Sequence, residues 1–214
     1  MSIAPEISLL FPTPLIAIEV PEAVALNADL RQAIEKRQQC QPSTQHSNLG
    51  GWQSSQDMDR WGGAPAIKLL AIGRNLANRV TTDRKGNVGN GPGCATGTWA
   101  ANMWANVNRC GDGNEFHAHP GAYWSGVYYV DDGGIADDAS LGGELEFMDP
   151  RGPLPAMHSP HLGFAAPGGL SGGATERLQP KAGRMVMFPS WLLHQVRPYR
   201  GGRERISIAF NLTV

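Results

Sequence analysis

Three histidines stand in strand-like sequence and together offer the ligands of a transition metal. His117 and His119 flank Ala118 shortly before the apolar run that begins at Ser125. Alternate residues of a strand point to the same side, so both imidazoles of this pair can face one interior. His194 follows a second apolar run and a Pro-Ser turn, where a strand end can bring its ring to the pair. Because imidazole binds iron, zinc and related ions well, His117, His119 and His194 predict a metal centre.

The alternative interpretation places His117 and His119 on the surface and makes His194 a hydrogen-bonded core residue. Any single histidine is more often of that kind, whereas the pair, the third histidine and a nearby arginine together favour a metal. Glu115, two residues before His117, is an alternative ligand to His119. Solvated positions are expected for the histidines of polar or Pro/Gly-rich segments, namely His46, His158 and His161.

An arginine and a serine close to His194 offer a carboxylate-binding site beside that centre. In residues 205–212, large apolar side chains alternate with Arg205, Ser207, Ala209 and Asn211, which therefore share the opposite face of a strand. A buried arginine is costly unless an anion meets it. Its guanidinium binds a carboxylate through two parallel hydrogen bonds, and a serine hydroxyl two residues on can donate another.

Two kinds of partner are considered for Arg205. A structural salt bridge would use Glu144 or Glu146, whereas the proximity of Arg205 to His194 in the sequence favours the carboxylate of a ligand. Tyr129 can supply a hydroxyl from a neighbouring strand, and Ser125 shares the face of Tyr129 by the period of two.

These side chains need a scaffold, and the pattern of residues 99–214 predicts strands. Short apolar segments are separated by Gly, Pro and Asp, as in an antiparallel sandwich or barrel with helices outside it. The Pro/Gly-rich residues 150–180 interrupt the pattern and are interpreted either as a lid or as a surface insertion. The expected strands are residues 99–107, 124–130, 142–147, 184–188 and 205–214.

The first half of the chain predicts one strand and two helices. Residues 9–20 are apolar with prolines that suit a sheet edge. Asn27 is a candidate cap for a helix over about 28–39. A second helix is expected from Pro65, with an apolar stripe that would pack on the sheet, and residues 41–63 are expected to form a polar connection. The stripe comprises Leu69, Ile72, Leu76 and Val80.

The composition indicates one domain of 214 residues with a net charge of −1. That charge gives no argument for a nucleic-acid partner, and no apolar run is long enough to span a membrane. Cys40, Cys94 and Cys110 lack the spacing of a zinc site and indicate free thiols in a reducing compartment. Since the first residues do not resemble a secretory signal, we expect a cytoplasmic protein.

Five sequence blocks in this order resemble the 2-oxoglutarate- and iron-dependent oxygenases. More narrowly, they resemble a poorly characterised bacterial and phage branch related to the prolyl-hydroxylase type. The likeness runs from about Trp99 to the carboxyl end, and the first, second and fourth blocks are the specific ones. The blocks are HAH at 117–119, SGVYYV at 125–130, GGELEF at 142–147, FPSWLLH at 188–194 and RIS at 205–207.

The resemblance implies a mainly β fold with flanking helices, a cupin-like double-stranded β-helix or jelly-roll. From the resemblance together with the pattern along the chain, we expect one domain over residues 1–214, in which an N-terminal strand and helices (about 1–95) pack on a jelly-roll core (about 96–214), with the lid-like insert at about 150–180. The resemblance also implies Fe(II) as the metal and 2-oxoglutarate as co-substrate, with His117 and His194 as ligands. Arg205 would hold the far carboxylate, and Tyr129 would bond the same group.

The implied activity is that of a dioxygenase that hydroxylates an unidentified substrate, small molecule or peptide, and releases succinate and CO2. One departure from the family pattern is that His119 stands where a carboxylate ligand is usual. The sequence therefore leaves open whether His119 or a carboxylate such as Glu115 completes the shell. A cupin-like three-histidine metalloenzyme that does not use 2-oxoglutarate, and a non-catalytic jelly-roll binding module, are the alternatives. The oligomeric state is also left open.

Overall fold

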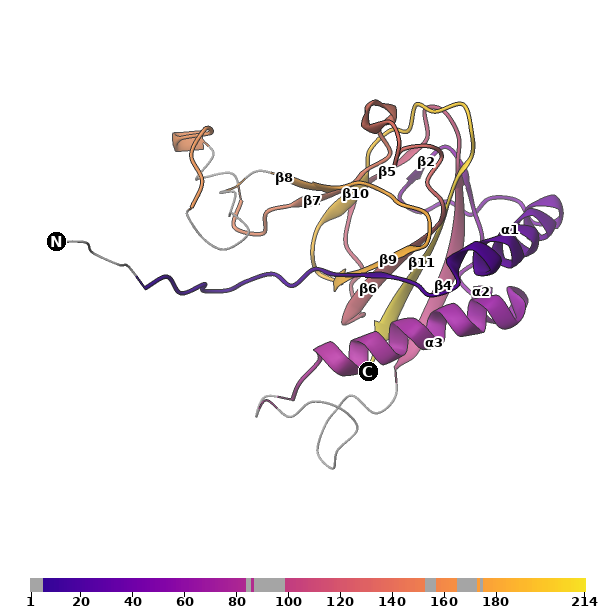
Figure 1. The fold of residues 1–214 in the computed structure, drawn as a ribbon, viewed down its shortest axis with the longest axis horizontal. Helices are drawn as coiled ribbons and strands as arrows, with labels where there is room; N and C mark the ends of the chain where they lie inside the picture. Colours follow the sequence, from indigo (N-terminus) through magenta and orange to yellow (C-terminus); the bar gives the residue numbers. More distant parts are fainter. Residues whose placement is uncertain (1–5, 84–85, 87–98, 153–156, 165–172, 174) are drawn as a thin grey trace.

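The computed structural model describes residues 6–83, 86, 99–152, 157–164, 173 and 175–214. Two antiparallel sheets face each other, with three helices against the outer side of the larger sheet (Figure 1). This is the mainly β jelly-roll that the sequence predicted. The strands are β1 (Ile16–Glu19), β2 (Asn48–Leu49), β3 (Trp52–Gln53), β4 (Ala100–Asn108), β5 (Gly113–His117), β6 (Trp124–Asp131), β7 (Leu145–Met148), β8 (Thr175–Leu178), β9 (Arg184–Pro189), β10 (His194–Val196) and β11 (Arg205–Thr213).

The larger sheet has the strand order β1-β9-β6-β11-β4-β3. Its central strand β11 pairs over its whole length with β4, from Arg205 opposite Asn108 to Thr213 opposite Ala100. On its other side β11 pairs with β6, which places Ser207 opposite Tyr129. Because β11 has a neighbour on both sides, the direction of every side chain along it is fixed by two registers.

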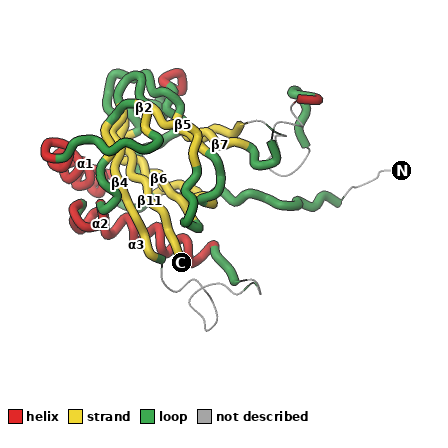
Figure 2. Tube along the Cα trace, turned by 180° about the vertical axis from the view of Figure 1, so that it is seen from behind, coloured by secondary structure: helices red, strands yellow, loops and turns green. Residues whose placement is uncertain are grey.

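The smaller sheet has the order β2-β5-β10-β7-β8 and carries the histidines. The short strand β10 lies between β5 and β7, with His194 opposite both His117 and Phe147. Figure 2 shows the two sheets from behind, with the helices on the side of β4 and β11. The inner faces of the two sheets enclose the space in which the predicted site residues meet.

The helices cover the outer face of the larger sheet and bury the apolar side of β11. They are α1 (Ala23–Cys40), α2 (Met58–Trp61) and α3 (Gly63–Val80). The main core joins side chains of these helices to those of the sheet. Its fully buried members include Leu30, Ile34, Leu69, Ile208 and Phe210.

The helices differ from the expectation at their starts and faces. The first helix begins at Ala23, so Asn27 lies within it and does not cap it. The Asn27 side chain instead accepts a hydrogen bond of 2.6 Å from the hydroxyl of Tyr128. In α3 three residues of the predicted stripe, Leu69, Ile72 and Leu76, pack against the main core, and small residues beside them allow close approach. The buried residues of α3 are Ala66, Leu69, Leu70, Gly73 and Ala77, whereas Val80 is exposed.

Several short elements were not predicted. The residues expected as a polar connection contain β2, β3 and α2, and the Pro/Gly-rich segment contains β8, which pairs with β7. Cys40 and Cys110 are free and exposed, whereas Cys94 lies outside the described residues. Among the helices that the structure describes, none is both long and apolar enough to cross a membrane.

Candidate metal centre

The pairing of β5 with β10 brings the three predicted histidines together. His117 ends β5 and His194 begins β10, and the two residues lie opposite each other. His119 follows β5 after one residue, and its backbone N–H bonds the carbonyl of Ser190 at 2.9 Å. The ring centroids are separated by 4.4 Å (His117–His194), 4.9 Å (His117–His119) and 5.1 Å (His119–His194). One ligand atom from each ring lies within 4.8 Å of the others, close enough to bind one ion.

Local backbone contacts select the nitrogen that each of two rings can offer. Nδ1 of His117 lies 2.7 Å from the carbonyl oxygen of Glu115, and Nδ1 of His194 lies 2.8 Å from that of Leu192. A carbonyl oxygen only accepts, so each Nδ1 carries the proton and each Nε2 keeps its lone pair. Such second contacts orient a ligating imidazole before the metal binds.

Burial also favours the neutral rings that a metal requires. Desolvation lowers the pKa of His194 from 6.5 to about 3, with the nearby His117 adding to the effect. Desolvation likewise lowers the pKa of His119 to about 4, and it lowers that of His117 against the opposing bond to Glu115. All three side chains are therefore unprotonated at neutral pH. Glu115, the alternative ligand, is exposed and does not belong to the cluster.

The histidines open into a cavity of about 290 Å³ between the two sheets. One wall is a row of polar side chains that crosses four strands of the larger sheet. Gln53 lies opposite Asn106, Asn106 opposite Ser207, and Ser207 opposite Tyr129. All four residues line the cavity, and Arg205 stands one step along β11 from Ser207 on the same face. The alternation predicted for residues 205–212 thus directs Arg205 and Ser207 inward.

Arg205 is fully buried and lacks an acidic partner. Its Nη1 donates to the Asn108 Oδ1 at 3.1 Å and to the Ser207 Oγ at 3.3 Å. Within the described part of the chain its Nε has no hydrogen-bond partner, and no ion pair to a carboxylate is formed. Desolvation lowers its pKa and outweighs the opposing effects of the nearby Tyr129, Tyr199 and Asp132, because burial disfavours the charged form. A ligand carboxylate in the cavity would supply what the guanidinium lacks.

Tyr129 and Ser125 lie on the neighbouring strand β6 and face the same cavity. The Tyr129 hydroxyl is buried without a hydrogen-bond partner among the described residues, and the Arg205 guanidinium carbon lies 5.4 Å from the centre of its ring. Burial raises the pKa of Tyr129, so its hydroxyl stays protonated and can donate. Ser125 already donates to Asn211 at 2.8 Å and contributes a fixed polar surface.

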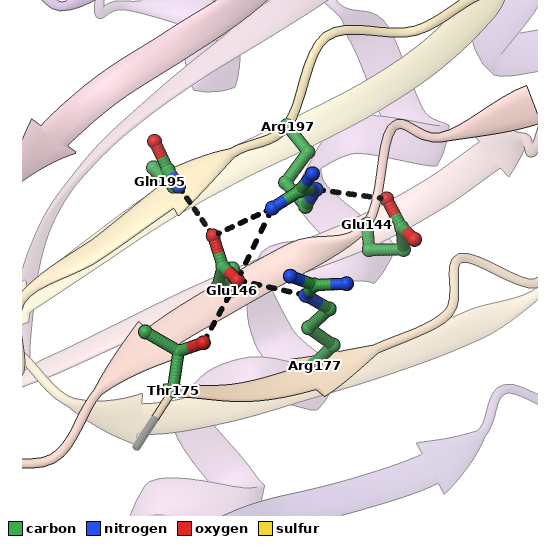
Figure 3. A network of polar contacts seen from close by, with 6 residues as sticks. All are labelled: Glu144, Glu146, Thr175, Arg177, Gln195 and Arg197. Carbon is green, nitrogen blue, oxygen red and sulfur yellow. Dashed lines mark hydrogen bonds and ion pairs between the residues drawn. The ribbon is translucent and has the colours of Figure 1, made fainter. Parts of the chain in front are cut away.

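The two glutamates considered as partners of Arg205 bind other arginines. Glu146 accepts from Arg177 at 2.7 Å and from Thr175 at 2.9 Å, and it also bonds Gln195 (Figure 3). Arg197 lies between the two glutamates. Its Nη1 is 3.4 Å from the Glu146 Oε1, and its Nε is 3.8 Å from the Glu144 Oε2. Glu146 alternates with the cavity-lining Leu145, so this network lies on the outer side of β7. The structural salt bridge predicted as the alternative for Arg205 is therefore absent from the described residues.

Several cavity residues could not be identified from the sequence. Asn108 meets Arg205 only through strand pairing, and Gln53, Gln56 and His46 come from segments that looked like plain connections. Trp104 and Asn106 also line the cavity. In contrast, Trp124 packs in the main core, Tyr123 is exposed, and His158 and His161 lie in other segments.

Comparisons with solved structures place this fold among prolyl hydroxylases. The Pseudomonas putida prolyl-4-hydroxylase is 15% identical over 94% of this chain and 92% of its own, with a TM-score of 0.57. A prolyl hydroxylase from Trichoplax adhaerens, solved with a hypoxia inducible factor peptide fragment, gives 15% identity, 93% and 83% coverage and a TM-score of 0.62. A viral collagen prolyl hydroxylase from Paramecium Bursaria Chlorella virus-1 was solved with 2-oxoglutarate (2OG). It is 14% identical over 94% of this chain and 96% of its own, with a TM-score of 0.56. At these identities the likeness establishes the fold.

Sequence comparison gives the family. No curated protein matches the chain. A family model described as "Putative 2OG-Fe(II) oxygenase" matches residues 102–211, slightly more than half of the 214 residues, and this range contains the three histidines and Arg205. The chain therefore belongs to this family of 2OG-Fe(II) oxygenases, as its sequence blocks had indicated.

Proposed function

We propose that the protein is an Fe(II)- and 2OG-dependent dioxygenase that hydroxylates its substrate and releases succinate and CO2. The family membership supports the reaction class. The observation that carries the proposal for this chain is Arg205, a fully buried cation without a carboxylate partner that lines the same cavity as the histidine cluster. A dicarboxylic co-substrate needs a cation of this kind at one end and a metal at the other.

His117, His119 and His194 would hold the iron. Three imidazoles within reach of one ion fit Fe(II), which accepts nitrogen ligands readily. His117 and His194 would bind through Nε2, because their Nδ1 atoms are engaged with backbone carbonyls. With His119 in place of the usual carboxylate, the protein ligands carry no negative charge. The charge of a bound iron would then be balanced mainly by 2OG.

Arg205 and Ser207 would bind the carboxylate of 2OG that lies far from the metal. The unpartnered Nε of Arg205 and the unpartnered hydroxyl of Tyr129 both can donate to it. The Asn108 Oδ1 accepts a hydrogen bond from Nη1 of Arg205 and thereby orients the guanidinium. Ser125, fixed by Asn211, completes the polar wall on β6.

When bound, Fe(II) and 2OG supply the activation of O2, with one oxygen atom entering a C–H bond of the substrate and the other entering succinate. The protein residues position the reactants and limit the access of water. Trp104 lies against His119 with 5.7 Å between ring centroids, and Phe188 lies 4.7 Å from His194. These aromatic rings shield two of the imidazoles from solvent.

The substrate is proposed to be a small molecule or a peptide. The peptide complex of the Trichoplax adhaerens enzyme supports a peptide for the shared fold. We further propose that residues 1–214 act as one domain, in which the segment at about 150–180 serves as a lid-like insert.

Anaerobic titration of the Fe(II)-loaded protein with 2OG tests the proposal. We expect a visible metal-to-ligand charge-transfer band in the wild type, because 2OG chelates iron through its keto-acid end. The band should be absent in His194→Ala, and in Arg205→Ala it should require at least about 100-fold more 2OG, since a buried charged contact is lost. Absence of the band in the wild type, or its persistence in His194→Ala, contradicts the proposal.

Turnover separates this function from the alternatives. A three-histidine metalloenzyme that does not use 2OG would keep its metal-dependent activity in Arg205→Ala. A non-catalytic binding module would release no succinate with iron, 2OG and ascorbate in any substrate screen. Succinate release that depends on both Arg205 and His194 is the result we expect.

A further inference from the structure

The segment before β1 projects from the body and exposes large apolar side chains. Figures 1 and 2 both show it as an extended arm, of which residues 6–15 are described, on the side of the β7–β8 hairpin. Four apolar residues between positions 7 and 11 are 53%, 46%, 80% and 95% exposed, namely Ile7, Leu9, Leu10 and Phe11. Such a dense apolar run is unfavourable in water and is typical of a segment that packs on another surface.

A groove that suits such a segment lies at the root of the arm. Its volume is about 700 Å³, and it runs between arm residues 11–15 and the loops at 148–151 and 160–163. Phe147 and Leu192 form its buried part. The groove is thus mainly apolar and lies open beside the arm.

The arm is poorly placed to fill the groove of its own chain. Phe11, Thr13 and Leu15 already form one wall of the groove. Pro12 and Pro14 fix their own φ angles and hold the residues before them out of the helical region, so the root of the arm resists folding back. Residues 6–10 therefore extend away from the groove that the root of the arm borders.

We propose that the arm of one copy, residues 6–10, packs in the groove of a second copy, and that the exchange is reciprocal. Each copy carries both the arm and the groove, so two contacts related by a two-fold axis close a dimer without further surfaces. A net charge of −1 per chain gives little repulsion. Six large apolar side chains and the groove walls that receive them would bury on the order of 1,200 Å², which is within the range of a stable interface.

Two further features support the exchange. β1, which continues the arm, and β8, beside the groove, are the terminal strands of the two sheets, so each has unpaired backbone groups that can bind another chain. Phe147 in the groove also packs on Phe188, with 4.9 Å between their ring centroids. The centroid of the Phe147 ring lies 6.2 Å from that of His194. Packing of a second arm would therefore support the aromatic side chains behind the metal centre, although the dimer itself does not depend on the proposed chemistry.

Sedimentation velocity of the full chain over a concentration series tests the dimer. We expect the wild type to be dimeric at micromolar concentration and the double variant Leu9→Asp/Leu10→Asp to raise the dimer Kd by at least about 30-fold. Val24→Asp is the matched control, because Val24 is 88% exposed on α1 and must leave the Kd unchanged. A monomeric wild type, or an unchanged Kd in the double variant, overturns the proposal.

Disulfide trapping shows which chain supplies the arm. The native cysteines are first replaced by serine, and Leu10→Cys chains are then mixed with Leu162→Cys chains under mild oxidation. We expect a disulfide-linked heterodimer on a non-reducing gel, formed more readily than by a Val24→Cys and Leu162→Cys mixture. If the Leu10→Cys/Leu162→Cys double variant forms only a bond within one chain, the arm occupies its own groove and the proposal fails.

Discussion

Arg205 is held by neutral side chains on one side and is open on the other. Asn108 and Ser207 accept from the same nitrogen, Nη1, and neither contributes a negative charge. The guanidinium is thereby oriented without being neutralised. This arrangement keeps the full charge available for a ligand, at the expense of burying a cation in the ligand-free protein.

Removing the support should weaken co-substrate binding without removing the charge. In Asn108→Ala we expect the Kd for 2OG to rise about tenfold, because one hydrogen bond that orients the cation is lost. Isothermal titration calorimetry of the metal-loaded protein without oxygen measures this. Asn102→Ala, on the same strand but bonded to Gln56, is the control and should stay within about twofold of the wild type. An unchanged Kd in a folded Asn108→Ala variant would show that Asn108 has no orienting role.

At the scale of the elements, helix α3 and strand β6 meet on either side of one aromatic ring. A Cβ atom added at Gly126 would lie 2.2 Å from Phe210, and one added at Gly73 would lie 2.9 Å from the same ring. Phe210 points away from the cavity into the main core. The absence of side chains at both glycines therefore lets the helix lie close to the sheet that carries Arg205.

The close contact predicts a large effect of one methyl group. Gly126→Ala should lower the free energy of unfolding by about 1–3 kcal/mol or more, because a planar ring cannot move away without disturbing both elements. Urea denaturation measures the loss, and Phe210→Leu in the same chain should recover part of it. Gly202→Ala, where an added Cβ has nothing within 4 Å, is the control. Equal stabilities of the two alanine variants would contradict the contact.

A second element-scale feature is the network that joins β7, β8 and β10 through Glu146 (Figure 3). Burial alone would raise the pKa of Glu146, but the hydrogen bonds from Arg177, Gln195 and Thr175 outweigh it and lower the pKa to about 2. The unfolded chain therefore takes up a proton near pH 4.5, before the folded protein does. The stabilisation is present above that pH and is lost as the pH falls towards 2.

Glu146→Gln should remove this pH dependence. We expect the variant to be less stable than the wild type at pH 7 by on the order of 2 kcal/mol, with the difference shrinking below about pH 4. The figure allows for the solvent exposure of Arg177. Chemical denaturation at a series of pH values measures both quantities, and Glu144→Gln, at the end of the network, should show a smaller effect. A difference that does not vary with pH would exclude Glu146 as its source.

At the scale of the molecule, the metal ligands join segments that lie far apart in the sequence. His117 and His119 come from one region and His194 from another, so an ion bound to all three stabilises only the folded chain. Adding Fe(II) without oxygen to chelator-treated protein should raise the Tm by about 5–10 °C at 100 times the Kd. His119→Ala should reduce the rise, and His46→Ala, at the exposed mouth, should not. A full rise in His119→Ala would exclude His119 from the metal shell.

Local pattern was enough to predict much of the site. The alternation in residues 205–212 placed Arg205 and Ser207 on the inner face, and the His-Ala-His spacing placed two imidazoles on one side of the chain. Both predictions rest on a period of two, which holds for any regular strand. The five expected strands are present for the same reason.

What the sequence did not reveal depends on pairing between distant segments. Asn108 becomes the partner of Arg205 only through the register of β4 with β11, which no local pattern encodes. The predicted stripe of α3 did not include Gly73 and Ala77, which are buried without being strongly apolar. The helix start at Ala23 was missed because tertiary contact uses Asn27 elsewhere, through the hydroxyl of Tyr128.

The central position of β11 has a consequence for biosynthesis. This strand is the last that the structure describes, yet it is inserted between β4 and β6. Those two strands end at Asn108 and Asp131, whereas β11 begins only at Arg205. Until residue 213 has left the ribosome, the two halves of the larger sheet have no strand to join them. The cavity also lacks Arg205, which lies on β11. The nascent chain must therefore wait with open sheet edges, a state that favours chaperone binding and slow folding.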